Sequence, residues 1–192
     1  MHPQLADLIV QVERVTEGVR VLAESMDHAA FARRPAPERW SPAECVMHLN
    51  LTTESFLPRF AKILAAHVSA PRDAGRRYRR DFFGWLLCTI LEPPYRTRSR
   101  TAAAFVPGAT LPRELVVAEF ERLNAALADR ARALAGLDLN ALPVDSPFRE
   151  GTHYNVWSAL CILAAHERRH LWQAQQAHGA HRAQQAQQAN AA

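Results

Sequence analysis

The chain has 192 residues, of which 48% are apolar and 22% are charged, and its formal net charge is +4. These values are ordinary for one soluble globular domain, and they exclude a wholly disordered chain and a collagen-like fibre. Lys62 is the only lysine, so arginine carries nearly all of the positive charge, which favours forked hydrogen bonds to anions.

The cellular setting is predicted from what the sequence lacks. The N-terminus shows no recognisable export signal, and the longest apolar run, residues 82–91, has about half of the ~20 residues that a membrane span needs. We therefore expect no membrane span. An odd number of widely separated cysteines predicts a reducing, cytoplasmic compartment. The cysteines are Cys45, Cys88 and Cys161.

Two helices are predicted in the first third of the chain. Apolar side chains recur every three or four residues from about residue 5 to 26, which indicates a bundle helix. A second helix begins at Pro42, where Ser41 and Glu44 have the spacing of a capping box. We expect it to run to about His67 with a kink at Pro58, because proline cannot donate to the preceding turn. The apolar stripe of the first helix is Leu5, Leu8, Val12, Val15, Val19, Leu22 and Met26.

Residues 71–110 are predicted to form a long connection that carries one short apolar helix. Between Arg72 and Arg100 there are eight arginines and three acidic residues, a local surplus of five positive charges. This stretch either forms a solvent-exposed loop surface or binds a carboxylate or phosphate. Nucleic acid is disfavoured as a partner, because few aromatic residues are interleaved with the arginines. The apolar residues Phe82, Phe83 and Trp85 are expected to cover the end of the bundle or to form a dimer contact.

Two further helices complete the predicted fold. The third helix starts at Thr110 and Pro112 and stops at Gly136. The last is capped by Asn155 and runs from Val156 to about residue 177, with Gly179 as its terminator. No segment shows convincing strand alternation. The sequence therefore predicts an all-α fold, an antiparallel four-helix bundle in a single domain over residues 1–179. The Gln/Ala-rich residues 180–192 are predicted to be a disordered tail.

Three of the nine histidines stand where core residues belong: His48 in the second helix, and His166 and His170 in the last. A separation of four residues places His166 and His170 on one helix face, so both imidazoles can address a common metal ion. A third ligand must then come from a neighbouring helix, and His48 is the candidate. Solvated or core histidines are the alternative. Glu167 follows the first histidine as in zinc proteases, but Arg168 does not suit that motif, and we reject a protease.

Two motifs together resemble the DinB-like superfamily over about residues 5–177. This resemblance implies a four-helix bundle in which His48, His166 and His170 bind a divalent metal. It also implies that a homodimer is possible. The motifs are Trp40-Ser41-Pro42-x-Glu44-x-x-x-His48-Leu49 and His166-Glu-Arg-Arg-His170-x-x-Gln173.

Three histidine ligands leave one coordination position for water or substrate, as in catalytic metal centres. Zinc or nickel fits three imidazoles best, with iron, manganese and copper as alternatives. Gln173 and Glu44 are candidates for orienting a ligand or a histidine from outside the coordination shell, although capping is the stronger reading for Glu44. Cys45 and Cys161 are expected to be core residues and not ligands.

The leading functional hypothesis is a metal-dependent enzyme that activates a low-molecular-weight thiol for transfer to an electrophile, the activity of several DinB-like subfamilies. Its partner would be a small anionic or thiol-containing molecule. One alternative is hydrolysis by a metal-bound hydroxide, although no general base stands out. Another is a non-catalytic metal-binding or stress-associated bundle. The sequence assigns no catalytic residue.

Overall fold

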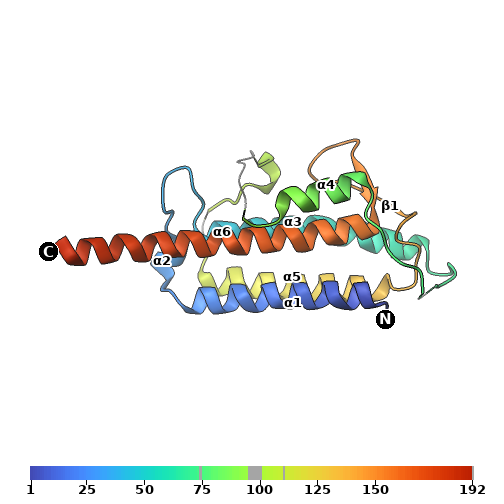
Figure 1. Cartoon of the computed structure of the whole chain (residues 1–192), viewed down its shortest axis with the longest axis horizontal. Coiled ribbons are helices and arrows are strands. Elements are labelled where there is room, and N and C mark those ends of the chain that lie inside the picture. The colour runs from blue at the N-terminus through green and yellow to red at the C-terminus, as the bar shows by residue number, and fades with distance from the viewer. Residues whose placement is uncertain (74, 95–100, 110, 192) are drawn as a thin grey trace.

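The protein is predominantly helical in the computed structural model, which describes residues 1–73, 75–94, 101–109 and 111–191 (Figure 1). Long connections precede and follow the short helix α4, and one small antiparallel sheet lies before the last helix. The elements in chain order are α1 (Pro3–Glu24), α2 (His28–Ala32), α3 (Pro42–Ala66), α4 (Phe82–Leu91), the 3₁₀ turn η1 (Ala103–Phe105), α5 (Arg113–Ala133), β1 (Pro143–Asp145), β2 (His153–Asn155) and α6 (Val156–Ala191).

The four long helices α1, α3, α5 and α6 enclose the apolar core. Helix α1 packs against α5 and α6, and α3 packs against the same two helices. The predicted stripe of α1 is buried over its whole length, from Leu5 to Met26, which is what an amphipathic helix with one apolar face requires. The largest fully buried side chains on the other helices include Phe56, Phe60, Phe120 and Leu127.

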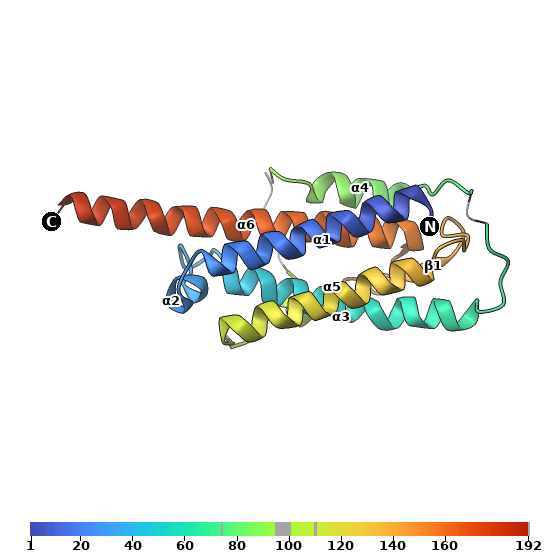
Figure 2. The same ribbon diagram turned by 90° about the horizontal axis from the view of Figure 1, so that it is seen from below.

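Helices α3 and α5 run in the same direction, whereas each is antiparallel to α1 and α6 (Figure 2). Asn50, in the first half of α3, donates to the carbonyl of Val116 near the start of α5 at 3.1 Å. Arg72, just after α3, donates to the carbonyl of Ala133 at the end of α5 at 2.9 Å. The expected antiparallel order therefore holds between these pairs but not within them, since α3 is parallel to α5 and α1 is parallel to α6. The reason is that the long connection returns the chain to the end from which α3 started.

The predicted start of α3 is confirmed. The Glu44 N–H donates to Ser41 Oγ at 3.1 Å, and the Ser41 N–H donates to the Glu44 carboxylate at 2.9 Å, which completes the capping box. The helix continues through Pro58 and ends at Ala66, with His67 as its C-cap. Helix α5 starts after Pro112, as predicted, whereas residue 110, which was also named for this start, lies outside the described residues. Gly136 follows α5 with φ of +82°, a conformation that glycine adopts without strain.

Two predictions about the second half of the chain are wrong. The segment after α5 contains a two-stranded sheet, in which Val144 pairs with Tyr154 and both are buried; three-residue strands are too short to show an alternating pattern. Helix α6 does not stop at Gly179 but continues to Ala191, so the expected disordered tail is helical in its described part. Ala177 and His181 are buried, and His181 Nε2 lies 2.9 Å from the Arg33 carbonyl. These contacts offset the roughly 1 kcal/mol that a glycine costs inside a helix.

The short apolar helix α4 forms as predicted, but it faces α6 with its small residues. Asp81 caps it by accepting from the Gly84 N–H at 2.7 Å. A Cβ atom on Gly84 would lie 2.1 Å from Ser158 Oγ, so the two helices approach closely at this point. The large apolar side chains consequently point outward and do not cover the end of the bundle. Phe82, Phe83 and Trp85 are 68%, 53% and 50% exposed.

Among the described residues we find no helix with the length and hydropathy needed to cross a bilayer. All three cysteines are free.

Candidate metal centre

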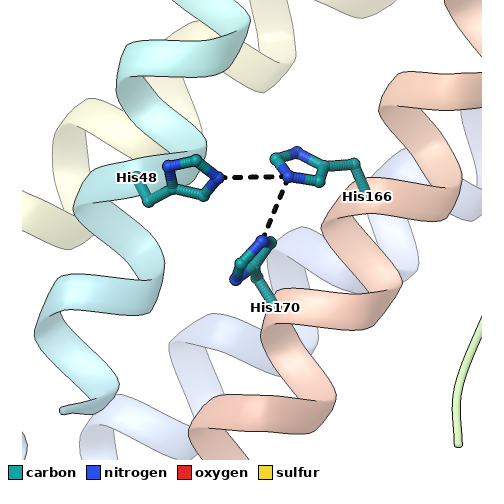
Figure 3. A group of neighbouring side chains, drawn as sticks. All are labelled: His48, His166 and His170. Carbon is teal, nitrogen blue, oxygen red and sulfur yellow. Dashed lines mark hydrogen bonds between the residues drawn. The ribbon is translucent and has the colours of Figure 1, made fainter. Parts of the chain in front are cut away.

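The predicted histidines meet in the core between α3 and α6 (Figure 3). His48 comes from α3, and His166 and His170 come from successive turns of α6. The three rings, here called the histidine cluster, are 4%, 8% and 5% exposed. One nitrogen of each lies within 4.8 Å of the others. The fold therefore brings together three residues separated by up to 122 positions in the sequence.

Hydrogen bonding orients His48 toward the other two rings. Its Nδ1 lies 2.7 Å from the carbonyl oxygen of Phe105, and because a carbonyl can only accept, Nδ1 must carry the proton. Nε2 of His48 is then a lone-pair donor in the neutral ring. It lies 3.1 Å from His166 Nε2, which in turn lies 3.1 Å from His170 Nε2. A backbone carbonyl that fixes the tautomer in this way is typical of metal-binding histidines.

The spacing of these nitrogens fits a transition metal ion. Zinc–imidazole bonds of about 2.0–2.1 Å in a tetrahedral arrangement place neighbouring ligand nitrogens about 3.3–3.4 Å apart, close to the two 3.1 Å separations. Three Nε2 atoms that face one another cannot all be satisfied by protons, because each contact needs one donor and one acceptor. A cation at their centre satisfies all three lone pairs.

The electrostatic environment keeps the cluster neutral and therefore able to bind a metal. Burial lowers the pKa of His48, and the nearby Arg169 lowers it further, against the opposing bond to Phe105. Burial also holds the pKa of His166 and His170 well below the ordinary value, and neighbouring histidines add to this effect. Neutral imidazole is the form that coordinates metals.

Aromatic residues from separate segments surround the cluster. The Trp40 ring lies 4.9 Å from the His48 ring and stacks on His170 at 5.8 Å between centroids. Phe148 lies 6.1 Å from the His166 ring. Sequence reasoning placed Trp40 in a motif but missed Phe105 and Phe148, because both stand in irregular segments without a periodic pattern.

Of the two residues predicted to support the site from outside, Glu44 is held elsewhere. Its carboxylate accepts a forked pair of hydrogen bonds from Arg34, in addition to its capping bond. Gln173 lies one turn after His170, and within the described residues its buried Oε1 has no hydrogen-bond partner. An amide oxygen of this kind is available to a ligand or bound water. Neither Cys45 nor Cys161 belongs to the cluster, and burial raises the pKa of both thiols to about 12.

Glu167 follows His166 but is not part of the histidine cluster. Its side chain is buried, and neither of its oxygens has a hydrogen-bond partner in the described part of the chain. Burial raises the pKa of Glu167 to about 8, so the group is mainly protonated near pH 7. This placement agrees with the rejection of a zinc-protease mechanism, in which an ionised glutamate beside the metal is the general base.

The described arginines of the connection do not surround the cluster. Arg72 caps the end of α5, and Arg76 pairs with Asp138 at 2.9 Å. Arg77, Arg79 and Arg80 line a cavity with Cys161 and Ala164, which lie on the face of α6 opposite to His166 and His170. Residues 95–100, which include the remaining arginines, lie outside the described residues.

The comparison with family models identifies the family of the chain. The model of the DinB superfamily matches residues 11–174, and the chain therefore belongs to the DinB superfamily. The match extends over the segments that supply all three clustered histidines and confirms the family suggested by the two motifs. Searches of curated proteins and of solved structures returned no match.

Proposed function

We propose that this DinB-superfamily protein is an enzyme that uses a divalent metal to activate a low-molecular-weight thiol for transfer to an electrophile. His48, His166 and His170 are the metal ligands in this proposal. The observation that carries it is their convergence, together with the lack of a fourth Cys, Asp or Glu ligand among the described residues. A three-histidine donor set with a position left for an exogenous group is typical of catalytic centres.

The domain that holds this site is proposed to be a four-helix bundle of α1, α3, α5 and α6 over residues 1–179. The mutual packing of these helices supports this. The ligands come from two of them, so the distance between α3 and α6 sets the size of the site.

When bound, the metal would supply Lewis acidity that lowers the pKa of the thiol, which then attacks as the thiolate. The chain's own residues prepare for this. The Phe105 carbonyl fixes the tautomer of His48, burial keeps the three rings unprotonated, and Trp40 shields two of them. Gln173 is proposed to orient the thiol or a bound water through its buried Oε1.

Three imidazoles suit zinc or nickel best, and iron and manganese are the alternatives, since availability in the cell also decides the metal. Elemental analysis of untagged protein tests the site directly. We expect about one equivalent of metal in the wild type and little in a His48→Ala/His170→Ala variant. The exposed His153 provides the matched control, because His153→Ala leaves the cluster intact. Equal metal content in all three proteins would contradict the assignment.

Activity is tested with glutathione or cysteine as the thiol and 1-chloro-2,4-dinitrobenzene as a chromogenic electrophile. The thiol loses its proton, a sulfur–carbon bond forms, and the carbon–chlorine bond breaks with release of chloride. We expect a metal-dependent rate that a chelator and His170→Ala abolish. A rate unchanged by either treatment would rule out thiol activation at this site.

A non-catalytic metal-binding bundle is the second candidate, because the cluster is buried and connects α3 to α6. In that case chelation would lower the melting temperature strongly while no thiol is ever turned over. Metal-hydroxide hydrolysis ranks lower, since the nearest carboxyl group in sequence, Glu167, is outside the cluster and mainly protonated. A homodimer and a cytoplasmic location stay predictions of the sequence; sedimentation and cell fractionation test them.

A further inference from the structure

A second candidate binding site lies on the side of α6 that faces away from the histidine cluster. There α1, α4, α6 and the segment before α4 enclose a cavity of about 790 Å³. Figure 2 shows α1 and α4 alongside α6. This volume is within the range of small-molecule sites, roughly 300–1,000 Å³. Its lining differs between the mouth, which is rich in arginine, and the interior, which is apolar.

Several charged groups of this cavity already have partners. Arg168 donates to both oxygens of Glu92 and to Gln11 Oε1. Asp81 accepts from the Gly84 and Asn155 backbone N–H groups. Arg168 and Glu92 therefore neutralise each other, whereas Asp81 keeps its negative charge, because its backbone N–H partners are uncharged.

Three arginines remain at the mouth: Arg77, Arg79 and Arg80, called here the arginine triplet. Within the described residues no carboxylate forms an ion pair with any of them. After the Arg168–Glu92 pair is set aside, the three arginines face two lining carboxylates in that part of the chain, Asp7 and Asp81, so the lining has an excess of one positive charge. Guanidinium groups that are not neutralised internally are well suited to bind a carboxylate, sulfonate or phosphate by forked hydrogen bonds.

The interior of the cavity is uncharged. Leu8, Trp157, Ala164, Cys88 and Cys161 contribute to its wall. Burial raises the pKa of Cys88, an effect that Arg80 partly opposes, and raises that of Cys161 to about 12, so both thiols are neutral near pH 7. An apolar body placed against these side chains would bury its surface at roughly 25 cal/mol per Å².

We propose that this cavity binds a small organic anion with an apolar body, whose acidic group contacts the arginine triplet and whose apolar part enters between α1, α4 and α6. The site is separate from the histidine cluster, because Cys161, Ala164 and Arg168 lie on the opposite face of α6 from His166 and His170. It requires neither the metal nor the thiol chemistry. A concave, partly apolar lining favours a small molecule over nucleic acid.

The test uses the full-length protein, the fluorescent aromatic sulfonate 8-anilinonaphthalene-1-sulfonate, and decanoate as a competitor. We expect decanoate to displace the dye at least tenfold more effectively than decanol, which has a similar chain but no charge. An Arg79→Gln/Arg80→Gln variant should lose this preference and bind decanoate at least tenfold more weakly. The matched control is Arg39→Gln/Arg130→Gln, which removes the same charge from exposed arginines on segments that do not line the cavity.

Two further variants distinguish the cavity from the exposed face of α4. Cys161→Phe fills the interior and should abolish displaceable binding while the circular dichroism spectrum stays unchanged. Phe83→Ser alters an exposed residue of α4 that does not line the cavity, and this variant should bind as the wild type does. Equal binding by both arginine variants, or loss of binding in Phe83→Ser alone, would overturn the proposal. So would binding to phosphatidylglycerol vesicles without binding of monomeric decanoate, which would make the region a membrane-contact surface.

Discussion

Replacing Glu44 by alanine should destabilise the protein and leave its metal binding intact. The Glu44 carboxylate accepts from the Ser41 N–H at 2.9 Å and from Arg34 Nε at 2.8 and 3.0 Å. None of these bonds reaches His48, although His48 lies only one turn further along α3. The variant therefore separates a structural role of Glu44 from the supporting role at the metal that its position in the motif also allowed.

The size of the effect follows from these contacts. Losing a helix cap costs about 1 kcal/mol. The Arg34 side chain is 48% exposed, so its ion pair adds at most about 1 kcal/mol. We expect a loss of roughly 1–2 kcal/mol in the free energy of unfolding, which corresponds to about 2–8 °C in melting temperature for a chain of this size.

The loss should also depend on pH. Burial by itself would raise the pKa of Glu44, but hydrogen bonds from Arg34 and Ser41 hold it below its ordinary value. A carboxyl with a lower pKa in the folded state stabilises the protein above its unfolded pKa of about 4.3 and loses this contribution as the pH falls through the folded value. The difference between wild type and Glu44→Ala should therefore be largest near pH 7 and shrink below about pH 4.

Urea unfolding at pH 7 and at pH 3.5, with elemental analysis in parallel, measures both quantities. Glu38→Ala is the control, because Glu38 is exposed and should change stability by less than about 0.5 kcal/mol. A Glu44→Ala protein that keeps its stability but loses metal would refute the reasoning and would place Glu44 beside the metal centre.

Three other results are expected. Gly84→Ala should push α4 away from α6 and speed amide exchange in residues 82–91, because the new Cβ would lie 2.1 Å from Ser158 Oγ. Gly108→Ala is the control, because a Cβ there would meet open space and should leave this exchange unchanged. Equal exchange rates in the two variants would show that the described packing of α4 on α6 is wrong. Metal-free protein should lose stability as the pH falls from 7 to 5, by up to about 1.4 kcal/mol per pH unit for each histidine of the cluster. The reason is that the pKa values of these histidines are lowered in the folded state, so the unfolded chain binds protons first. A free energy of unfolding in urea that does not change with pH would contradict the buried neutral state. His181→Ala should lower the free energy of unfolding by about 1 kcal/mol and speed amide exchange in α6 beyond residue 179, because His181 contacts the Arg33 carbonyl. Amide exchange like that of the wild type would show that this contact does not stabilise the end of the helix.

The sequence by itself determined the features that depend on neighbouring turns of one helix. The capping box of Ser41 and Glu44 involves residues three apart, and the four-residue spacing of His166 and His170 fixes their common face. The short apolar helix α4 was predicted from the run of apolar residues 82–91, which is also a local feature. In each case the deciding hydrogen bonds or side-chain directions are local, so that the residue pattern is sufficient.

Other features were decided only by tertiary structure, because their partners are distant in the chain. The Phe105 carbonyl that orients His48 is 57 residues away, and no spacing rule relates an irregular segment to a helix. The Arg34 contact that holds Glu44 depends on how the loop before α3 folds back. Similarly, α6 continues beyond Gly179, where His181 contacts the Arg33 carbonyl, although the Gln/Ala-rich composition of this segment predicted disorder. The direction of α5 and the position of the arginine triplet depend on the path of the long connection, which is set by packing against α1 and α6 and not by local preference.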